Sequence, residues 1–370
     1  MVVPYDLAEE GGVKRHAMQL AATLRQLGDE VDVIGPCSDP RALGDHTHGF
    51  AGIVNIQSNG SDNRLGIFAS PRKAWRLFRA NRYDVVHIHE PLQPTLNYYA
   101  LSMCGAAARV GTFHAFMENE SRTMRLARKL SGAVALRWVD RGIAVSAAAA
   151  ECARVAFPRP LAIIPNGIRT ALYAQGRAQV AGAPLRILFV GHWRDARKGL
   201  PHLLDACAQL TARGIAWALD VIGDGGAQPR AQLPGVHYHG AIQSERVLAD
   251  HYAACDVFVA PSTGAESFGI VLLEAMAAER PIVCSDIPGY RDVVGTGPSS
   301  GARRVPPGSS DGLAGALAEL AADPALRTRL GALNRDRVRL FEWDRLVGKV
   351  RDEYVAALDA RRGVPSAPLR

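Results

Sequence analysis

The chain alternates short apolar runs with longer amphipathic stretches. The short runs predict strands, and the segments between them repeat apolar residues at helical spacing, as over residues 13–27 and 122–139. This rhythm is typical of βαβ units that build a parallel sheet. In the first half of the chain, the predicted strands are residues 31–35, 84–89, 108–113 and 142–146.

The same rhythm begins again after a polar stretch rich in Gly and Ala at residues 174–184. We therefore expect an α/β protein with two doubly wound domains, joined between residues 166 and 184. The length of 370 residues agrees with this, because a domain usually takes about 100–200 residues. In the second half, the predicted strands are residues 185–191, 218–223, 236–240, 256–260 and 281–285.

The two ends of the chain leave alternatives open. Residues 1–5 resemble the end of a strand, so either the first strand is short or the natural start lies upstream. Residues 343–358 form an amphipathic helix, which either completes the second domain or crosses back onto the first. Its apolar positions at helical spacing are Leu346, Val350, Tyr354 and Leu358.

Composition narrows the class of protein. Hydrophobic residues make up 48% and charged residues 21%, which is typical of a globular chain. No apolar run reaches the ~18 residues of a membrane span, and no secretion signal is evident at the start. None of the six cysteines forms a CxxC pair, so we expect a reduced, cytosolic protein without a zinc site. A net charge of +7 favours an acidic partner: nucleic acid, an anionic membrane or a phosphorylated substrate.

The strongest candidate site is the sequence GAESFGIVLLEAM. Glu266 falls in the loop after a predicted strand, where parallel sheets bind ligands, and Glu274 falls inside the next helix. Both carboxylates can accept hydrogen bonds from sugar hydroxyls, and apolar neighbours argue against a solvated Glu274. The backbone N–H groups of Phe268, Gly269 and Ile270 open the helix and suit an anion.

Two further loops carry candidate anion ligands. The loop GHWRDARKG follows the first strand of the second half, and His192, Arg194, Arg197 and Lys198 there could neutralise a diphosphate. The alternative is an ordinary solvated basic loop. Near the start, Gly12 belongs to a Gly-Gly pair that lets the backbone approach a ligand. No GxGxxG pattern is present, so a nicotinamide cofactor is poorly supported.

A histidine and a basic helix complete the candidates. His114 ends a predicted strand in the first domain, whereas His87 within a strand reads as structural. Residues 70–82 predict a helix with Trp75 and Phe78 on an aromatic face, which favours binding to a membrane surface over an ordinary surface helix. Its cations are Arg72, Lys73, Arg76 and Arg79.

Together these motifs resemble the retaining glycosyltransferases of family four, which have the GT-B fold. The E-x7-E spacing from Glu266 to Glu274 carries the resemblance, with DVVHIHEP, TFHA, IAVS, IPNGI and RKG. It implies two Rossmann-like domains that face a cleft: an acceptor domain over residues 1–166 and a donor domain over 167–340, followed by a helix and tail over 341–370. Within the family, the chain looks most similar to the bacterial phosphatidyl-myo-inositol mannosyltransferases.

The resemblance also implies roles for individual residues. On the donor side, Glu266 would bind sugar hydroxyls, Glu274 the ribose, and Lys198 the diphosphate, with Arg197 a weaker candidate. Gly12 would approach the donor phosphates, the N–H groups of residues 268–270 would assist, and His114 would sit at the reacting sugar. His192 stands where the family usually has arginine, which supplies more charge. The acceptor-side candidates are Asp6, Asn59 and Arg64.

The expected activity is therefore transfer of a sugar, first mannose, from a nucleotide diphosphate with retention of configuration. GDP-mannose is the first expected donor and a UDP-sugar the second, with no obligatory cofactor or metal because no DxD-like motif stands out. The acceptor would be a lipid-linked or phosphorylated polyol at the cytoplasmic face of a membrane, and no nucleic acid is expected. Alternatives are a polysaccharide or small soluble acceptor, a nucleotide-sugar 2-epimerase, and a binding protein that lost catalysis.

Overall fold

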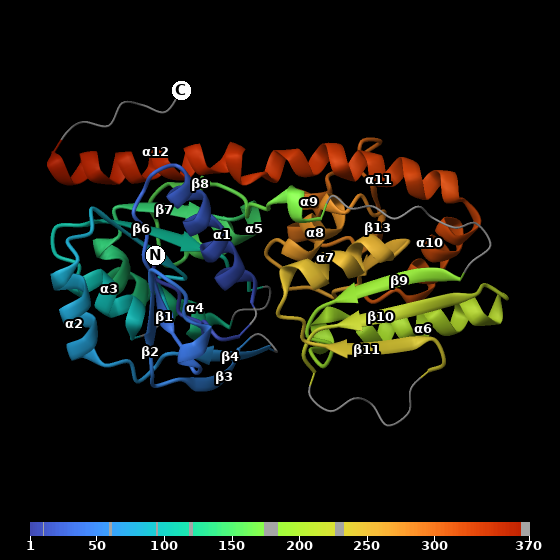
Figure 1. Cartoon of the computed structure of the whole chain (residues 1–370), viewed down its shortest axis with the longest axis horizontal. Helices are drawn as coiled ribbons and strands as arrows, with labels where there is room; N and C mark the ends of the chain where they lie inside the picture. The colour runs from blue at the N-terminus through green and yellow to red at the C-terminus, as the bar shows by residue number, and fades with distance from the viewer. Residues whose placement is uncertain are drawn as a thin grey trace. The chain divides into compact units, whose positions relative to one another are not determined.

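The chain forms two compact units, each built on a parallel sheet covered by helices (Figure 1). Unit 1 comprises Met1–Gly167 and Trp343–Arg370, and unit 2 comprises Ile168–Glu342. The C-terminal segment therefore belongs to the first unit. The structure, a computed structural model, describes residues 1–9, 11–58, 61–93, 95–117, 121–173, 184–225 and 233–363.

In unit 1, Val2 joins two blocks of parallel strands into one sheet. Val2 bridges Ile34 on one side and Ile88 on the other. Its N–H donates to the His87 carbonyl at 2.8 Å, and its carbonyl accepts the His89 N–H at 2.9 Å. In sheet order the strands are β2 (Thr47–Phe50), β1 (Val33–Pro36), β5 (Val85–His89), β6 (Ala108–Phe113), β7 (Arg141–Ala144) and β8 (Leu161–Ile163).

The four strands predicted for the first half are confirmed within about two residues as β1, β5, β6 and β7. Strands β2 and β8 were not predicted, nor was the antiparallel hairpin of β3 (Val54–Ser58) and β4 (Ser61–Leu65). The helices are α1 (Gly12–Gln26), α2 (Pro71–Ala80), α3 (Leu96–Met103), α4 (Arg122–Ala135), α5 (Ala147–Arg154) and α12 (Trp343–Arg362), with 3-10 turns η1 (Pro40–Ala42) and η2 (Leu136–Trp138).

Serine side chains begin three of these helices. Ser70, Ser121 and Ser146 accept the backbone N–H three residues later and so cap α2, α4 and α5. A cap of this kind contributes about 1 kcal/mol, because it satisfies an N–H that has no partner inside the helix. Across the described ranges, no helix is both long and apolar enough to cross a bilayer.

Helix α12 fills the core of unit 1 through Trp343. The indole is buried and lies against Gly167, where a Cβ would come within 2.4 Å of the ring. Its Nε1–H donates to the Gln19 side chain of α1 at 3.1 Å. Further along α12, Leu346 and Val350 pack into the same cluster as the leucines of α1. The C-terminal helix is thus part of the core of unit 1.

Unit 2 contains a six-stranded parallel sheet. In sheet order the strands are β11 (Val236–Gly240), β10 (Trp217–Ile222), β9 (Leu185–Val190), β12 (Val257–Ala260), β13 (Ile282–Ser285) and β14 (Ala302–Val305). All five strands predicted for the second half are confirmed, and β14 was not predicted. The helices are α6 (Leu200–Ala212), α7 (Glu245–Ala254), α8 (Ile270–Ala277), α9 (Pro288–Val294), α10 (Ser310–Ala322) and α11 (Pro324–Val338), with 3-10 turns η3 (Thr170–Leu172), η4 (Ala196–Lys198) and η5 (Arg339–Phe341).

The packing of α12 gives a stability prediction. We expect Trp343→Ala to lower the free energy of unfolding of unit 1 by about 3–5 kcal/mol, because it removes a large buried ring. The matched control is Trp75→Ala, since Trp75 is 51% exposed and should change stability by less than about 1 kcal/mol. Urea unfolding followed by circular dichroism measures both. Equal effects of the two substitutions would contradict this account of α12.

Candidate functional site

In unit 2, two loops meet where neighbouring parallel strands end. Strands β9 and β12 pair side by side, so the loops that follow them leave the sheet at the same edge. The ammonium group of Lys198 forms an ion pair with the carboxylate of Glu266. The backbone also joins the loops, since the Thr263 N–H donates to the Arg197 carbonyl at 2.8 Å. Two residues predicted for donor binding are thereby brought together.

Gly199 allows this close approach. Its φ is +72°, in the left-handed region, and a Cβ there would lie 2.0 Å from the carbonyl oxygen of Pro261. Only glycine meets both demands without moving the backbone. On the neighbouring loop, Gly269 has φ +91° and precedes α8, whose first residue is Ile270. The N–H groups at this helix start have no partner within the helix, which suits an anion.

Arg197 is held by its own loop. The buried carboxylate of Asp195 accepts the Arg197 backbone N–H at 3.0 Å and its Nη2–H at 2.6 Å. This pairing directs the charge of Arg197 toward Asp195. Arg194 is exposed and lies over the Trp193 ring, 5.3 Å from its centroid. His192 is only partly exposed. Lys198 contacts Glu266, a second predicted ligand residue, on the neighbouring loop.

Glu274 lies inside α8 and is 1% exposed. The Tyr252 hydroxyl donates to Glu274 Oε2 at 2.8 Å. A buried carboxylate is costly unless hydrogen bonds compensate for its lost hydration, so Tyr252 helps α8 to accommodate it. Phe268 is also buried, with its ring 5.9 Å from that of Phe341. The carboxylate is thus fixed by its surroundings, as expected of a group that orients a ligand.

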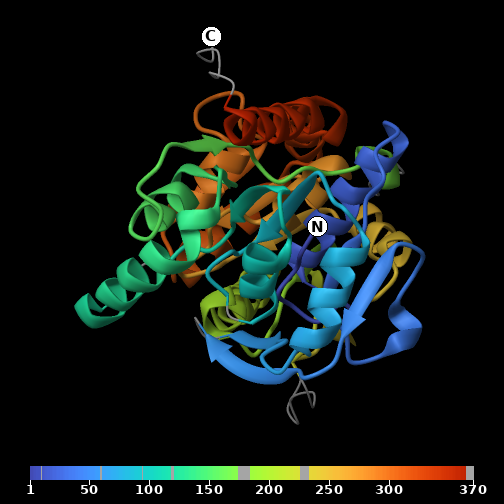
Figure 2. The same cartoon turned by 90° about the vertical axis from the view of Figure 1, so that its left-hand side faces the viewer.

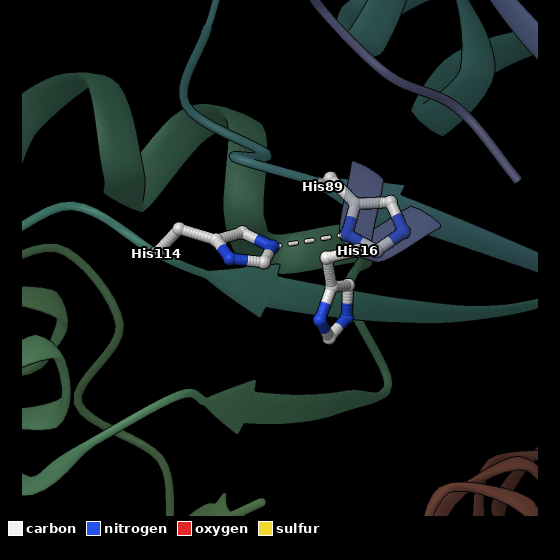
Figure 3. Close-up of side chains that lie close together, drawn as sticks. All are labelled: His16, His89 and His114. Atoms are coloured by element: carbon white, nitrogen blue, oxygen red, sulfur yellow. Dashed lines mark hydrogen bonds between the residues drawn. The ribbon is translucent and has the colours of Figure 1, made fainter. Parts of the chain in front are cut away.

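In unit 1, His114 belongs to a cluster of three histidines (Figure 3). His89 Nδ1 and His114 Nε2 are hydrogen-bonded at 3.0 Å, and the His16 ring lies edge-on to both. Burial lowers the pKa of His114 and His89 well below the usual value, and lowers the pKa of His16 to about 3. Neutral imidazoles can hydrogen-bond a sugar hydroxyl, but they do not neutralise a phosphate.

Sequence reasoning missed Glu90, which organises the loop of His114. Its carboxylate accepts the backbone N–H groups of His114 at 2.5 Å and Ala115 at 2.6 Å. Burial raises the pKa of Glu90 to about 7, although these two hydrogen bonds act in the opposite direction. Its own φ is +50°, which is uncommon outside glycine. The available signal was an acidic residue immediately after the strand at residues 84–89.

The acceptor-side candidates are partly brought together. Arg64 forms ion pairs with Asp6, at 3.3 Å, and with Glu9. Asp6 also accepts backbone N–H groups through Oδ1, including that of Ala8 at 3.0 Å, so it holds its own loop in place. Asn59 lies outside the described residues. Gly12 is the exposed first residue of α1.

The four predicted membrane-facing cations are exposed along α2: Arg72, Lys73, Arg76 and Arg79. Lys73 also donates to the Gly49 carbonyl at 2.5 Å, and the Arg79 guanidinium lies 5.4 Å from the centroid of the Trp75 ring. The expected aromatic face is wrong at Phe78, which is buried in the core. The phase of α2 against the sheet turns Phe78 inward and leaves Trp75 outside.

Two groups of described side chains bring three potential metal ligands within 4.8 Å of one another. One is the cluster of His16, His89 and His114. The other is Asp220, His239 and His251 in unit 2, where His239 Nε2 already hydrogen-bonds Asp220 Oδ1 at 2.6 Å. Each group draws on three different elements, so sequence spacing revealed neither. The expectation that catalysis needs no metal stays a prediction.

Two parallel-sheet units with ligand candidates at the ends of their strands are the architecture of the GT-B fold. Comparison of solved structures agrees: Anabaena HepE, solved in complex with UDP and glucose, superposes with a TM-score of 0.73 at 17% identity, covering 95% of this chain and 97% of that one. Residues 10–172 match the family described as "Glycosyltransferase Family 4", and residues 184–323 match "Glycosyl transferases group 1". The chain belongs to these family 4, group 1 glycosyltransferases.

Two relatives indicate its place within the family. The phosphatidyl-myo-inositol mannosyltransferase of Mycolicibacterium smegmatis is 33% identical over 363 residues, covering 96% of this chain and 92% of the relative. The D-inositol 3-phosphate glycosyltransferase of Kineococcus radiotolerans is 31% identical over 247 residues, covering 58% and 56%. The comparisons do not support the epimerase alternative.

The buried histidines give a pH prediction. An unfolded histidine binds a proton near pH 6.5, whereas the folded pKa of His16 is about 3. Between these values the unfolded chain holds the extra proton, so stability falls as the pH falls, by up to about 1.4 kcal/mol per pH unit for each such histidine. We expect His16→Asn to reduce the dependence of the free energy of unfolding on pH by the contribution of one histidine. Urea unfolding between pH 7 and pH 5 measures this dependence.

The slope of the His16→Asn variant is compared with that of the unsubstituted protein, because Glu90 changes stability with pH in the opposite direction. Its raised pKa means that the folded state holds a proton there up to about pH 7, which adds stability as the pH falls. Glu90 is present in both chains and cancels in the difference. The matched control is Gln26→Asn, at an exposed position of the same helix without a titratable group, and it should keep the slope of the unsubstituted protein. If the free energy of unfolding of His16→Asn changed with pH as it does in the unsubstituted protein, the lowered pKa of His16 would be contradicted.

Proposed function

We propose that this enzyme transfers mannose, with retention of configuration, from GDP-mannose to the polyol headgroup of an inositol phospholipid. The observation that carries the proposal is the ion pair of Lys198 and Glu266. Glu266 lies in the loop before α8, and α8 itself carries Glu274. The mannosyltransferase name of the M. smegmatis relative supports the sugar and the acceptor class. We place the reaction at the cytoplasmic face of the membrane, with the protein bound peripherally.

On the donor side, Lys198 and the N–H groups before α8 would hold the diphosphate. Glu266 would accept hydrogen bonds from mannose hydroxyls, and Glu274 would hold the ribose. Charge develops on the departing diphosphate in a transition state with oxocarbenium character. A fixed ammonium group and the positive end of a helix stabilise that charge without reorganising.

The chemical step needs no enzyme nucleophile. The bond from the mannose anomeric carbon to the diphosphate oxygen breaks, and a bond from the same carbon to the acceptor oxygen forms on the same face. The acceptor hydroxyl gives its proton to the departing phosphate oxygen, so the products are GDP and the mannosylated acceptor. The neutral His114 imidazole would hydrogen-bond a hydroxyl of the sugar while it reacts.

On the acceptor side, Arg64 is the cation for a headgroup phosphate. In the free enzyme it is paired with Asp6 and Glu9, so binding of the phosphate would exchange one of these contacts. A soluble inositol phosphate presents the same chemistry, and the name of the Kineococcus relative favours it as the second candidate acceptor. Transfer to phosphatidylinositol and to inositol phosphate, assayed side by side, separates the two.

For the membrane surface, α2 supplies the charge. Arg72, Trp75 and Arg76 line a surface hollow of about 390 Å³ together with Pro71. Exposed cations beside a half-exposed indole suit the headgroup region of an anionic bilayer.

The donor assignment predicts a loss of transfer. We expect Lys198→Ala to lower kcat for mannosyl transfer from GDP-mannose by about 10²-fold or more, because the leaving diphosphate loses its cation. We expect Glu274→Ala to abolish detectable transfer while circular dichroism shows an intact fold. The matched control is Tyr252→Phe, which removes a hydrogen bond to Glu274 but keeps its carboxylate. Undiminished turnover in Glu274→Ala would overturn the donor-site assignment.

The α2 assignment predicts salt-sensitive membrane binding. Co-sedimentation with anionic vesicles should weaken as salt is added, because screening removes the attraction. It should also weaken when Arg72, Lys73, Arg76 and Arg79 are replaced by glutamine. Binding that is absent, or that does not respond to salt, would remove α2 from the proposal.

A further inference from the structure

Strand β11 forms one edge of the sheet in unit 2 and pairs with β10 (Figure 1). The two strands run parallel, and Asp220 of β10 lies opposite His237 of β11. Successive side chains of a strand point to opposite faces, so His239 shares the face of His237 and Asp220. The other face carries Leu219 and Val221, which are buried in the core of the unit. Two histidines and a carboxylate are thereby aligned on one face at the edge of the sheet.

Helix α7 covers that face. The unit β9–α6–β10 crosses the sheet in one direction and β11–α7–β12 crosses it in the other. Right-handed crossovers therefore place α6 and α7 on opposite faces. In Figure 2, α6 (yellow-green) and α7 (gold) lie on opposite sides of the sheet. Because Leu219 and Val221 pack in one cluster with the leucines of α6, Asp220 points toward the side of α7.

His251 of α7 completes a group of three potential ligand atoms, with Asp220 and His239, that all lie within 4.8 Å of one another. His239 Nε2 is hydrogen-bonded to Asp220 Oδ1 at 2.6 Å, and the ring centroids of His239 and His251 are 4.6 Å apart. His237 Nδ1 lies 3.7 Å from the same carboxylate oxygen. Three imidazoles therefore gather around one carboxylate.

These donor groups suit a divalent transition-metal ion such as Zn²⁺. Zinc binds imidazole nitrogen and carboxylate oxygen at about 2.0–2.2 Å, which sets tetrahedral ligand atoms about 3.3 Å apart. The side chains of Asp220 and His239 are 36% and 33% exposed, so they can rotate to that spacing and an ion can enter from solvent. Mg²⁺ and Ca²⁺ prefer sites made of oxygen atoms, which a group of imidazoles does not provide.

We propose that Asp220, His239 and His251 bind one zinc ion, with His237 or water at the fourth position. The ion would fasten the edge strand β11 to α7 and so stabilise unit 2. The loops of the candidate donor site follow β9 and β12, whereas this group stands on β10, β11 and α7. The inference therefore does not depend on the proposed function.

The test uses the full chain without an affinity tag, freed of metal by a chelator and titrated with Zn²⁺ alone in a calorimeter. We expect His239→Gln and His251→Gln each to lower zinc affinity by about 100-fold or more, because even the loss of a hydrogen bond to a ligand costs about 10–100-fold. The matched control is His202→Gln on α6, a partly exposed histidine outside the group, which should bind zinc as the unsubstituted protein does.

Two further measurements use neither donor nor acceptor. Zn²⁺ at about 100 times its Kd should raise the Tm of unit 2 by about 5 °C or more in the unsubstituted protein and leave that of His239→Gln unchanged. Mg²⁺ and Ca²⁺ in the same excess should not displace the zinc. If both histidine variants bound zinc as tightly as the unsubstituted protein, the ion would lie elsewhere and the inference would be wrong. An unsubstituted protein that bound no zinc would also overturn it.

Discussion

The pairing of β9 with β12 is the constraint on which the candidate donor site depends. These strands are far apart in the sequence, yet Ile187 lies opposite Val257 and Leu188 opposite Phe258 in parallel register. Their carboxyl ends therefore open at one edge of the sheet, and the loops that follow must share the space there. Gly199 lacks the Cβ that would keep them apart. The contact of Lys198 with Glu266 follows from this order of strands.

In unit 1, burial sets the charge of the candidate site. His16, His89 and His114 stay neutral because the surrounding core lowers their pKa, and the C-terminal helix contributes to that core. Trp343 lies with its ring 5.0 Å from that of His16, and the Tyr354 hydroxyl is hydrogen-bonded to His87 Nδ1 at 2.7 Å. A change in α12 would thus reach His114 through side chains in contact. Helix α12, near the C-terminus, thus supports the histidine cluster, whose members all come from the first third of the chain.

Local patterns predicted most of the fold, because apolar alternation and helical spacing are properties of the sequence itself. They failed where tertiary packing decides. β14 carries Arg303 and Arg304, whose charges are met by Glu319 and Asp286, so the strand lacks an apolar signature. Phe78 faces inward because the core sets the phase of its helix. The histidine cluster combines α1, β5 and the end of β6, and no spacing along the chain connects those three elements.

The ion pair of Lys198 and Glu266 also bears on whether the candidate donor site would prefer a nucleotide sugar or a nucleotide diphosphate. Under the proposed assignment, Lys198 would bind the diphosphate and Glu266 the sugar, but in the free enzyme they bind each other. An intact nucleotide sugar replaces that contact with one ligand contact for each. A nucleotide diphosphate without sugar would take Lys198 and leave the largely enclosed carboxylate of Glu266 unpaired, which costs free energy. Under the proposed assignment, the ion pair would therefore favour the complete donor over the product that must leave.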